Sequence, residues 1–378
     1  MHLHLRALAV HLHLKLLAEL GVLFVVALVL LIMFVRGTRR MRITIAAVLA
    51  IFFAGREIRK HIPPFEQGVH DSVVQAGIDV ERADLPHLGP CQVFPANNIW
   101  NTPIDSLHKD RRSQDYVDSI GPLHPVHPDF GSSLETGIPY TLIPATTKRV
   151  KITFDYREDS DLSNYPIPPD APIENGPDSK GDRHILLVDE NRCLLFEIYD
   201  AHPKGDGTWT AGSGIIMDLT SNALRTEGKT SADAAGLPIL PGLVRYDEVT
   251  AGAINHALRF TVPHTQAAWV WPARHKASHI TDLKVPPMGV RFRLRADFDI
   301  SKYSKTNQVI MKALKKYGMF LADNGSAMFI SGVSDKRWDD ADLHKLGDMK
   351  AEDFEAVDES DWQLMEDSAR VDPLSFKR

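Results

Sequence analysis

The chain has 378 residues, of which 44% are hydrophobic and 24% are charged. This composition is typical of a globular protein with one large domain or two small ones, and it excludes a disordered chain. Residues 1–60 contain nine basic and two acidic residues, which leaves a net charge of −13 on residues 61–378. A surface this acidic repels phosphate backbones, so we expect no nucleic acid partner.

Two apolar runs near the N-terminus are directed to a membrane. Residues 20–35 are apolar apart from Gly21 and approach the length needed to span a bilayer, while residues 43–55 have the length of a signal-peptide hydrophobic region. The basic cluster at 36–42 is expected to stay in the cytoplasm, which places the chain after the second run outside it. Residues 1–60 are therefore predicted to be a membrane-directed segment or signal anchor, with Met41 as an alternative start.

The rest of the chain is predicted to comprise a linker at 61–90, a β-rich globular domain at 91–357 and an acidic tail at 358–378. Cys91 and Cys193 suit an oxidising compartment and are expected to form one disulfide, with two unlinked thiols as the alternative. The globular domain is thus expected to be extracytoplasmic, in a protein that is membrane-anchored or secreted.

The predicted elements are mostly strands. In chain order, β-rich runs predict strands at about 149–155, 184–188, 193–199, 213–218, 257–262, 267–271, 289–296, 318–322 and 327–330. Helical periodicity is limited to 247–257, 305–317 and an acidic stretch at 340–356. We expect a mainly β fold with a few appended helices, and the long Pro/Gly-rich loops favour a sandwich or jelly-roll-like domain.

Polar side chains occur within a predicted buried hairpin at 184–199. If Val188 pairs with Cys193 across the turn 189–192, His184 lies opposite Glu197 on one face of the hairpin. The other face is wholly apolar and should be core; it carries Ile185, Leu187, Leu194, Phe196 and Ile198.

The His184–Glu197 pair has two interpretations. A Glu beside a His can have its pKa tuned for acid–base catalysis, which makes both residues catalytic candidates. Asp200 and His202 lie just beyond the strand end, where the mouth of a site would be, and are candidate catalytic and substrate-binding residues. Asp-x-His with a second His also suits a metal. The alternative is a structural polar pair at a sheet edge followed by an ordinary turn.

The loop at 155–182 is rich in carboxylates and prolines and is too long to be a mere connection. It predicts either a substrate-facing lid or a Ca²⁺ site with oxygen ligands from Asp159, Asp161 and Asp182. Its spacing matches no EF-hand loop, so a solvated acidic loop without any cofactor is the alternative.

A second polar loop at 219–248 supplies Asp233 as a catalytic candidate, because no helix is predicted to follow it that Asp233 could cap. Arg245 is a candidate substrate-binding residue that could clamp a carboxylate or a sugar hydroxyl. Asp247 is better explained as the cap of the helix that follows.

Aromatic residues suggest a sugar-binding platform at 269–275. Alternation places Trp269 and Trp271 on the same face, where they would stack on a sugar or else pack in the core, and His275 follows at the loop rim as a further binding candidate. Asp323, by contrast, precedes Asn324-Gly325 and is predicted to belong to a hairpin turn rather than to a site.

Several catalytic signatures are absent from the sequence: it has no G-x-S-x-G, H-E-x-x-H, P-loop or Cys-x-x-Cys motif. Three segments carry a resemblance instead: 94–104 (FPANNIWNTPI), 165–174 (YPIPPDAPIE) and 230–238 (TSADAAGLP). They resemble a family of exported, mostly bacterial, β-rich proteins of unassigned function. The resemblance covers 91–357 and implies export and a single domain, but it supplies no activity and no catalytic residues.

Two functions from different classes follow. The first is an extracytoplasmic glycoside hydrolase that acts on carbohydrate through paired carboxylates, with Glu197 and either Asp233 or Asp200 in the acid and base or nucleophile roles. The second is a non-catalytic surface module that binds a glycan or another ligand. A more distant third is a metal-dependent oxidoreductase using His184, His202 and His275.

Overall fold

The computed structural model describes residues 85–371. Both apolar N-terminal runs, most of the predicted linker, and residues 372–378 lie outside this range. Within the described range, no helix combines the length and the apolar character needed to cross a membrane.

The described domain is mainly β with few helices, as expected. Its strands are β1 (His87–Leu88), β2 (Cys91–Gln92), β3 (His127–Asp129), β4 (Tyr140–Ile143), β5 (Val150–Phe154), β6 (Asn164–Tyr165), β7 (Ile185–Asp189), β8 (Leu194–Tyr199), β9 (His202–Pro203), β10 (Trp209–Ala211), β11 (Ser213–Asp218), β12 (Leu258–Val262), β13 (Arg291–Leu294), β14 (Met319–Asn324), β15 (Phe329–Ser331) and β16 (Phe354–Ala356). The α-helices are α4 (Ser113–Ile120), α5 (Tyr246–Ala251), α6 (Lys305–Lys316) and α7 (Asp340–Leu343). Short 3-10 helices are η2 (Ile99–Asn101), η3 (Arg157–Asp159), η4 (Leu240–Gly242), η5 (His344–Asp348), η6 (Ala351–Asp353) and η7 (Ser360–Trp362).

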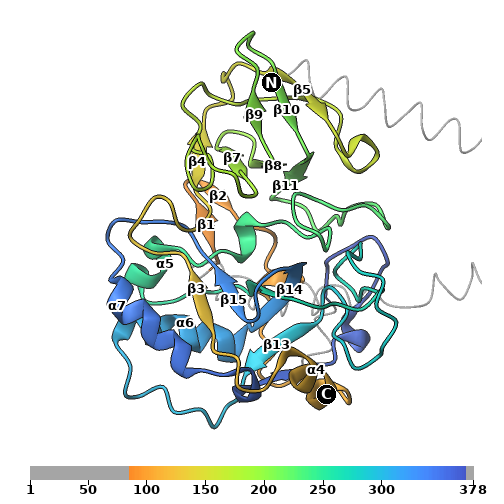
Figure 1. The fold of residues 1–378 in the computed structure, drawn as a ribbon, viewed down its shortest axis with the longest axis vertical. Coiled ribbons are helices and arrows are strands. Elements are labelled where there is room, and N and C mark those ends of the chain that lie inside the picture. Colours follow the sequence, from red (N-terminus) through yellow and green to blue (C-terminus); the bar gives the residue numbers. More distant parts are fainter. Residues whose placement is uncertain (1–84, 372–378) are drawn as a thin grey trace, which may run out of the picture. The chain divides into compact units, whose positions relative to one another are not determined.

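The strands form several sheets, and the larger ones are mixed (Figure 1). Their orders are β1-β2, β6-β5-β10-β9, β11-β8-β7-β4 and β16-β13-β14-β12-β15-β3. Parallel pairs occur between β4 and β7, β5 and β10, β12 and β14, and β3 and β15. A jelly roll is antiparallel, so these parallel pairs distinguish the observed sheets from that arrangement.

The predicted hairpin exists as β7 and β8, but its register is shifted. Leu186 pairs with Glu197, so the expected pairing of His184 with Glu197 is wrong. The reason is the turn: Asp189 pairs with Leu194, and Cys193 lies in the turn with a φ of 52°. The Asp189 side chain accepts hydrogen bonds from the backbone N–H groups of Asn191 and Arg192, which stabilises this longer turn.

The shift is two residues, so the faces of the hairpin are the expected ones. Ile185, Leu187, Phe196 and Ile198 pack in one apolar cluster, with Leu194 against it. The opposite face is also core, because Leu186, Val188 and Leu195 pack in the larger cluster that includes the six-stranded sheet. Glu197 therefore lies on a strand that has buried side chains on both of its faces.

The predicted hairpin at Asn324-Gly325 is wrong. Strands β14 and β15 do not pair with each other, because β12 lies between them, parallel to β14 and antiparallel to β15. The Asn-Gly signal is local, whereas the observed pairing joins segments far apart in the chain. Strand β14 consequently runs on through Asn324 and carries Asp323 to its end.

Helix α6 was predicted well because its signals are local. Ser304 caps it by accepting a hydrogen bond from the N–H of Asn307, and its apolar positions, including Val309, Ile310, Ala313 and Leu314, are buried. Gly318 follows with a φ of 65°, which favours glycine after a helix end. Figure 1 shows α5, α6 and α7 beside the six-stranded sheet.

Two other predicted elements differ from the structure. The acidic stretch 340–356 is helical only in α7, after which it forms 3-10 turns and β16. The predicted strand at 267–271 makes only an isolated bridge, between Trp269 and Met288. In 340–356 the apolar positions, such as Leu343, Leu346 and Met349, are buried without a continuous helix.

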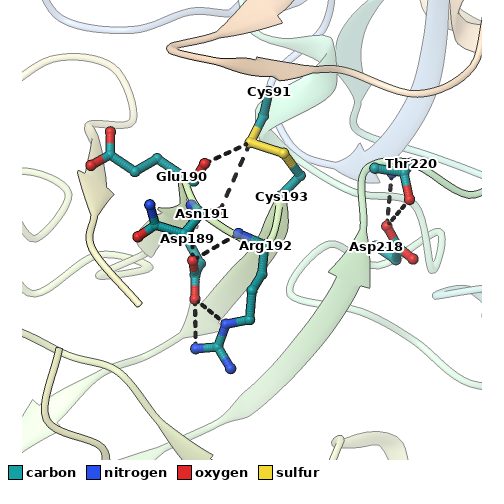
Figure 2. The surroundings of a disulfide bond; sticks show 8 residues. All are labelled: Cys91, Asp189, Glu190, Asn191, Arg192, Cys193, Asp218 and Thr220. Atoms are coloured by element: carbon teal, nitrogen blue, oxygen red, sulfur yellow. Dashed lines mark hydrogen bonds and ion pairs between the residues drawn. A yellow bond between two sulfur atoms is a disulfide. The ribbon is translucent and has the colours of Figure 1, made fainter. Parts of the chain in front are cut away.

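Cys91 and Cys193 form the expected disulfide, with a Cα–Cα distance of 5.4 Å (Figure 2). It joins β2 to the β7–β8 turn, 102 residues further along the chain. A disulfide of this kind is consistent with an extracytoplasmic location.

The packed domain extends on both sides of 91–357. Strand β1 pairs with β2, and near the other end Trp362, Ala369 and Val371 are buried. Residue Arg370 also makes a β-bridge to Asn98. The described part of the predicted acidic tail thus contributes to the core.

Candidate functional site

A loop at residues 229–240 organises the most polar part of the interior. The Ser231 hydroxyl donates to the carbonyl of Leu237 at 2.5 Å and accepts from the N–H of Asp233 at 2.9 Å. Gly236 has a φ of 72°, and a Cβ there would lie 2.7 Å from the Lys229 carbonyl oxygen. The loop is therefore a fixed support rather than a loose connection, and it holds Asp233 in place.

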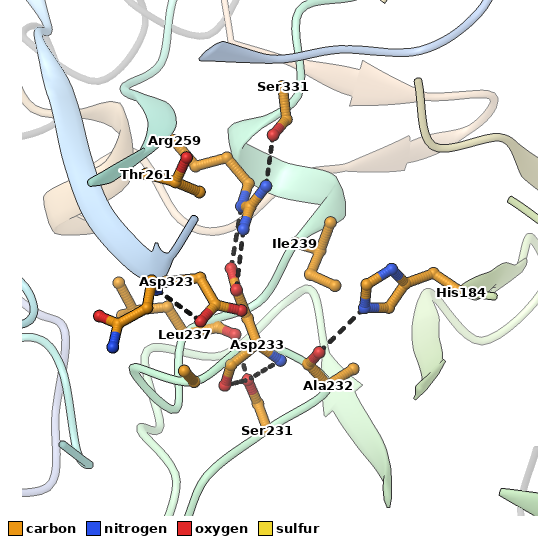
Figure 3. Close-up of polar contacts among 12 residues, drawn as sticks. His184, Ser231, Ala232, Asp233, Leu237, Ile239, Arg259, Thr261, Asp323 and Ser331 are labelled. Carbon is orange, nitrogen blue, oxygen red and sulfur yellow. Dashed lines mark hydrogen bonds and ion pairs between the residues drawn. The ribbon is translucent and has the colours of Figure 1, made fainter. Parts of the chain in front are cut away.

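Asp233 is fully engaged by a cation from the six-stranded sheet. Arg259 of β12 donates from Nε and Nη2 to the two carboxylate oxygens of Asp233, at 2.9 and 2.8 Å (Figure 3). Arg259 also donates to the hydroxyl of Ser331 on the neighbouring strand β15. Asp233 is only 2% exposed, so its charge is compensated inside the protein.

Asp323 is the second carboxyl group of this cluster. A register irregularity between Phe260 and Thr261 brings Asp323, at the end of β14, opposite Thr261. Burial, together with the charge and hydrogen bond of Asp233, raises the pKa of Asp323 to about 8, although Arg259 acts in the opposite direction. Asp323 is nevertheless partly exposed. Asp323 thus combines a raised pKa with access to solvent.

His184 lies on the other side of the same loop. Its Nδ1 is 2.6 Å from Oε2 of Glu174. Its Nε2 is 3.1 Å from the carbonyl oxygen of Ala232 (Figure 3). Burial opposes protonation of the ring, but the hydrogen bond and charge of Glu174 raise the pKa of His184 to about 9. Both ring nitrogens face acceptors, so His184 is an imidazolium that ties Glu174 to the loop.

Further polar groups surround the cluster. Burial raises the pKa of Asp129 on β3, and Arg259, Glu174 and Asp182 all act on it electrostatically. Tyr199, at the end of β8, has its ring centroid 5.6 Å from that of His184. Burial, then Asp182 and Asp200, and more weakly Asp323, raise the pKa of the Tyr199 hydroxyl. Carboxylates from several segments of the chain thus act electrostatically on the hydroxyl of one tyrosine, Tyr199.

Glu197 has a structural environment. It is 0% exposed, and its carboxylate accepts hydrogen bonds from the N–H groups of Ile239, at 3.0 and 2.9 Å, and Leu240, at 2.8 Å. Burial raises the pKa of Glu197 to about 7, while these N–H groups act in the opposite direction. Glu197 holds the end of the 229–240 loop and presents no free carboxylate to a substrate.

Asp200 and His202 lie at an exposed edge. His202 Nε2 is 2.6 Å from the Asp200 carboxylate, and both side chains are more than a third exposed, at 48% and 40%. The pair belongs to the strand end at β9, and Asp200 is within electrostatic range of Tyr199.

Arg245 is buried and is bound both to its own segment and to the carbonyl oxygen of His87, 3.4 Å from its Nη2. Its Nη2 is 2.5 Å from Glu248, which also lies 3.1 Å from His256. Arg245 occupies the N-cap position of α5, so the expectation that Asp247 caps this helix is wrong. Asp247 and Glu248 instead lie in its first turn, where carboxylates favour the helix dipole.

The 269–275 segment is divided between two environments. His275 donates from Nδ1 to the carbonyl of Ala234 at 2.9 Å and so contacts the 229–240 loop. The indole N–H of Trp271 donates to the Ser368 carbonyl at 2.9 Å, and the ring is partly buried. Trp269 packs partly buried against the main core.

Four of the candidate residues therefore meet at one loop. His184, Glu197 and His275 each bind a backbone group of the segment that carries Asp233, whereas Arg245 is engaged with Glu248. Sequence reasoning missed Glu174, Arg259 and the role of Asp323. Glu174 lies ten residues before His184 in an acidic loop, whereas Arg259 and Asp323 come 26 and 90 positions after Asp233. Charged residues in or beside predicted buried strands were the signal for Arg259 and Asp323, and Glu174 had none.

Of the predicted calcium ligands, Asp161 is engaged by other protein groups. The Asp161 carboxylate accepts from Arg225 and from the N–H of Ile216, both at 2.9 Å. Among residues 85–371, no group of three or more His, Cys, Asp or Glu side chains is placed to hold a metal ion.

Comparison with known proteins adds no identification: no family model, no curated protein and no solved structure matches this chain. The resemblance to an exported family therefore stays a prediction.

Proposed function

We propose that the domain is an extracytoplasmic glycoside hydrolase in which Asp323 is the proton donor. The observation that carries this proposal is the partly exposed Asp323 at the end of β14, close to the buried Asp233 (Figure 3), where burial and the charge of Asp233 raise the pKa of Asp323 to about 8. Cleavage of a glycosidic bond needs an acid that is protonated at working pH and within reach of the leaving oxygen.

Asp233 acts as a positioning residue in this proposal. Hydrogen-bonded carboxyl groups lie closer than the roughly 5–5.5 Å that separates acid and nucleophile in retaining glycosidases. Both oxygens of Asp233 are also bound by Arg259. Asp233 therefore keeps the proton on Asp323, and another carboxylate must act on the sugar carbon or on water.

Asp182 is the carboxylate that we assign to water activation. It is exposed, and it acts on the Tyr199 hydroxyl from a different chain segment than Asp323 does. In the proposed step, water attacks the anomeric carbon as its bond to the leaving oxygen breaks. Asp182 takes a proton from the water, and Asp323 gives its proton to the leaving oxygen. Room for a water between two carboxyl groups is a feature of inverting enzymes.

Two tyrosines supply the aromatic surface next to these groups. Tyr199 and Tyr156 both flank Gly212, whose N–H donates to the Tyr199 carbonyl and whose carbonyl accepts from the N–H of Tyr156, each at 2.8 Å. Tyr156 is 56% exposed, which suits stacking against a sugar ring.

The location and architecture belong to the same proposal. The disulfide favours an oxidising compartment, and the predicted segment at 1–60 would anchor or export the domain. In this proposal two sheets contribute to the site, as in a sandwich-like domain. The β7–β8 sheet supplies Tyr199, and the six-stranded sheet supplies Arg259 and Asp323.

The test is turnover by the full chain in detergent on a panel of polysaccharides. Release of reducing ends, with inversion at the anomeric carbon in NMR spectra of early product, is the expected result. Retention of a glycan without any product would favour the non-catalytic binding module instead. Product with retained configuration would overturn the role of Asp182 while leaving that of Asp323.

A further inference from the structure

One row of side chains across the six-stranded sheet is partly exposed, whereas the neighbouring row is buried. Asp323 of β14 pairs with Thr261 of β12, which in turn pairs with Phe329 of β15. Phe329 pairs with His127 of β3. All four side chains, called the exposed row below, are partly exposed. The neighbouring row, which faces the core, consists of Leu321, Phe260, Ile330 and Pro128, all of them buried.

A bulge in β14 brings Asp323 into the exposed row. Leu321 pairs with Phe260, and Asp323 pairs with Thr261, the residue that follows Phe260. Ala322 is therefore an extra residue in β14. Without it, strand alternation would place Asp323 on the same face as Leu321, which is the core face. The bulge thus turns the carboxyl group of Asp323 to the face that carries the other three side chains of the row.

The exposed row ends in two stacked rings that lie well away from Asp323. The ring centroids of His127 and Phe329 are 4.2 Å apart, with an angle of 30° between the ring planes. Partly exposed rings suit the apolar faces of sugars. The strand order β14-β12-β15-β3 separates Asp323 from His127 by three steps, which is roughly 14 Å at about 4.8 Å per step. A single sugar ring is shorter than this, so a sugar on the two rings is not the one whose leaving oxygen Asp323 would protonate.

The exposed row borders the proposed site. Asp129 follows His127 by two positions, lies on the same face of β3 and is exposed. Asp182, which we assign to water activation, acts electrostatically on both Asp129 and Tyr199. The row therefore runs beside the carboxylates of the site, and Asp129 adds an acceptor for sugar hydroxyls next to the two rings.

We propose that the exposed row is a glycan-binding surface and that the substrate is a chain of several sugars rather than a glycoside of one or two. This inference rests on the proposed function, because Asp323 marks the place of cleavage. The sugar beside the cleaved bond lies at Asp323, and a sugar further along the chain packs on the rings of Phe329 and His127. These two residues are therefore specificity residues that select for chain length.

Hydrolysis of a length series tests the proposal, with the full chain in detergent and cello-, xylo-, manno- and chito-oligosaccharides of two to six sugars. In the series that is cleaved, kcat/KM is expected to rise at least tenfold from the disaccharide to the hexasaccharide. Phe329→Leu should lower kcat/KM for the hexasaccharide by about twofold to tenfold more than for the disaccharide, which is the size of one aromatic contact. A kcat/KM that does not depend on length, or an equal loss on both substrates, would overturn the proposal.

Binding separates this proposal from the proposed hydrolysis. Native gels that contain β-glucan, xylan, galactomannan or glycol chitin serve as the measurement, and at least one of these polysaccharides is expected to retard the native chain more than Phe329→Leu. If no oligosaccharide is cleaved, such a difference supports the glycan-binding surface while the hydrolase assignment fails. No retardation in any of the gels overturns the surface itself.

Phe298→Leu is the matched control. The ring of Phe298 is also partly buried and stacked on another ring, that of Tyr303, but it lies outside the exposed row. This variant should leave the retardation and the length preference unchanged. Phe329→Trp keeps an aromatic ring and should keep both properties, whereas His127→Ala, on the edge strand β3, should act like Phe329→Leu. Melting temperatures identify any variant that folds poorly, and equal effects of Phe329→Leu and Phe298→Leu would refute the proposal.

Discussion

Glu197 and Asp323 are two carboxyl groups of the same domain with similarly raised pKa values and opposite surroundings. Burial is the largest cause of the increase in both cases, to about 7 and about 8. Glu197 is closed off by backbone N–H groups on a central strand, whereas Asp323 is partly exposed at a strand end. A raised pKa therefore marks both a structural group and a candidate catalytic one, and access distinguishes them.

The comparison extends to the segments around these residues. The β7–β8 hairpin, with Glu197 and the disulfide, has apolar cores on both faces and is expected to determine stability. The ends of β12 and β14, with Arg259 and Asp323, are expected to determine catalysis. Substitutions in the two regions should separate these effects.

The largest expected effect is that of Asp323→Asn. Loss of the proton donor should lower the hydrolysis rate about 100-fold to 10,000-fold, because general acid catalysis contributes this much. The melting temperature should change little, since the amide keeps the shape and can still donate to Asp233. Rates and melting curves are measured together. Asp297→Asn, at a 70% exposed side chain, is the control, and an equal rate loss there would contradict the assignment.

Breaking the disulfide tests the stability side of the comparison. Cys193→Ser should lower the free energy of unfolding by about 4–5 kcal/mol, since closing a loop of about 100 residues removes this much in the chain-entropy model. Denaturant unfolding of the exported protein measures the change. The rate per folded molecule should persist, and a variant that folds fully but has lost its activity would contradict the division between the two regions.

Glu197→Gln should lower the free energy of unfolding by less than Cys193→Ser does. The amide offers one acceptor where the carboxylate serves the N–H groups of Ile239 and Leu240, so we expect a loss of about 1–3 kcal/mol. Activity of the folded fraction should be retained. Loss of turnover without loss of stability would restore Glu197 as a catalytic residue and reverse our interpretation of this site.

The pH dependence of turnover should follow Asp323. Its pKa of about 8 predicts that the protonated acid, and with it the rate, is maintained near neutral pH and falls about tenfold per unit well above pH 8. A pH–rate profile on a neutral glycan measures this decline. A rate that is constant from pH 7 to pH 10 would exclude Asp323 as the donor.

The smallest expected effect is on stability at alkaline pH. The folded pKa of His184, about 9, exceeds its ordinary value of 6.5, so protonation stabilises the fold fully below pH 6.5 and this contribution is lost as the pH rises through 9. The melting temperature should therefore fall over this range by more in the native chain than in His184→Gln. Parallel curves for both proteins would show that the charge on His184 is not coupled to folding.

Local patterns predicted much of the fold. Alternation at 184–199 identified β7, β8 and the faces of the hairpin, and helical periodicity at 305–317 identified α6. The register was not predictable, because the Asp189 side chain stabilises a longer turn than the strand pattern suggests. The position of β12 between β14 and β15 depends on pairing between segments far apart in the chain, which no short segment encodes.

The candidate site was predictable only in part. His184 was identified because a charged group in a predicted buried strand is unusual, and Asp233 because no helix follows that it could cap; both lie in the observed cluster. The pKa of Asp323 depends on Asp233, ninety positions earlier in the chain, and a turn signal at Asn324 concealed it. Glu174 was hidden in a loop with many other acidic residues.

The pairing of strands far apart in the chain also bears on how the domain folds during synthesis. Strand β3 pairs with β15, about two hundred residues later, and Asn98 forms a bridge with Arg370. Strand β3 thus has no partner in its sheet until β15 has been synthesised, and contacts this distant slow folding. The six-stranded sheet of a nascent chain therefore stays incomplete for most of its synthesis, whereas the sheet of β4, β7, β8 and β11 has all of its strands once residue 218 has been made.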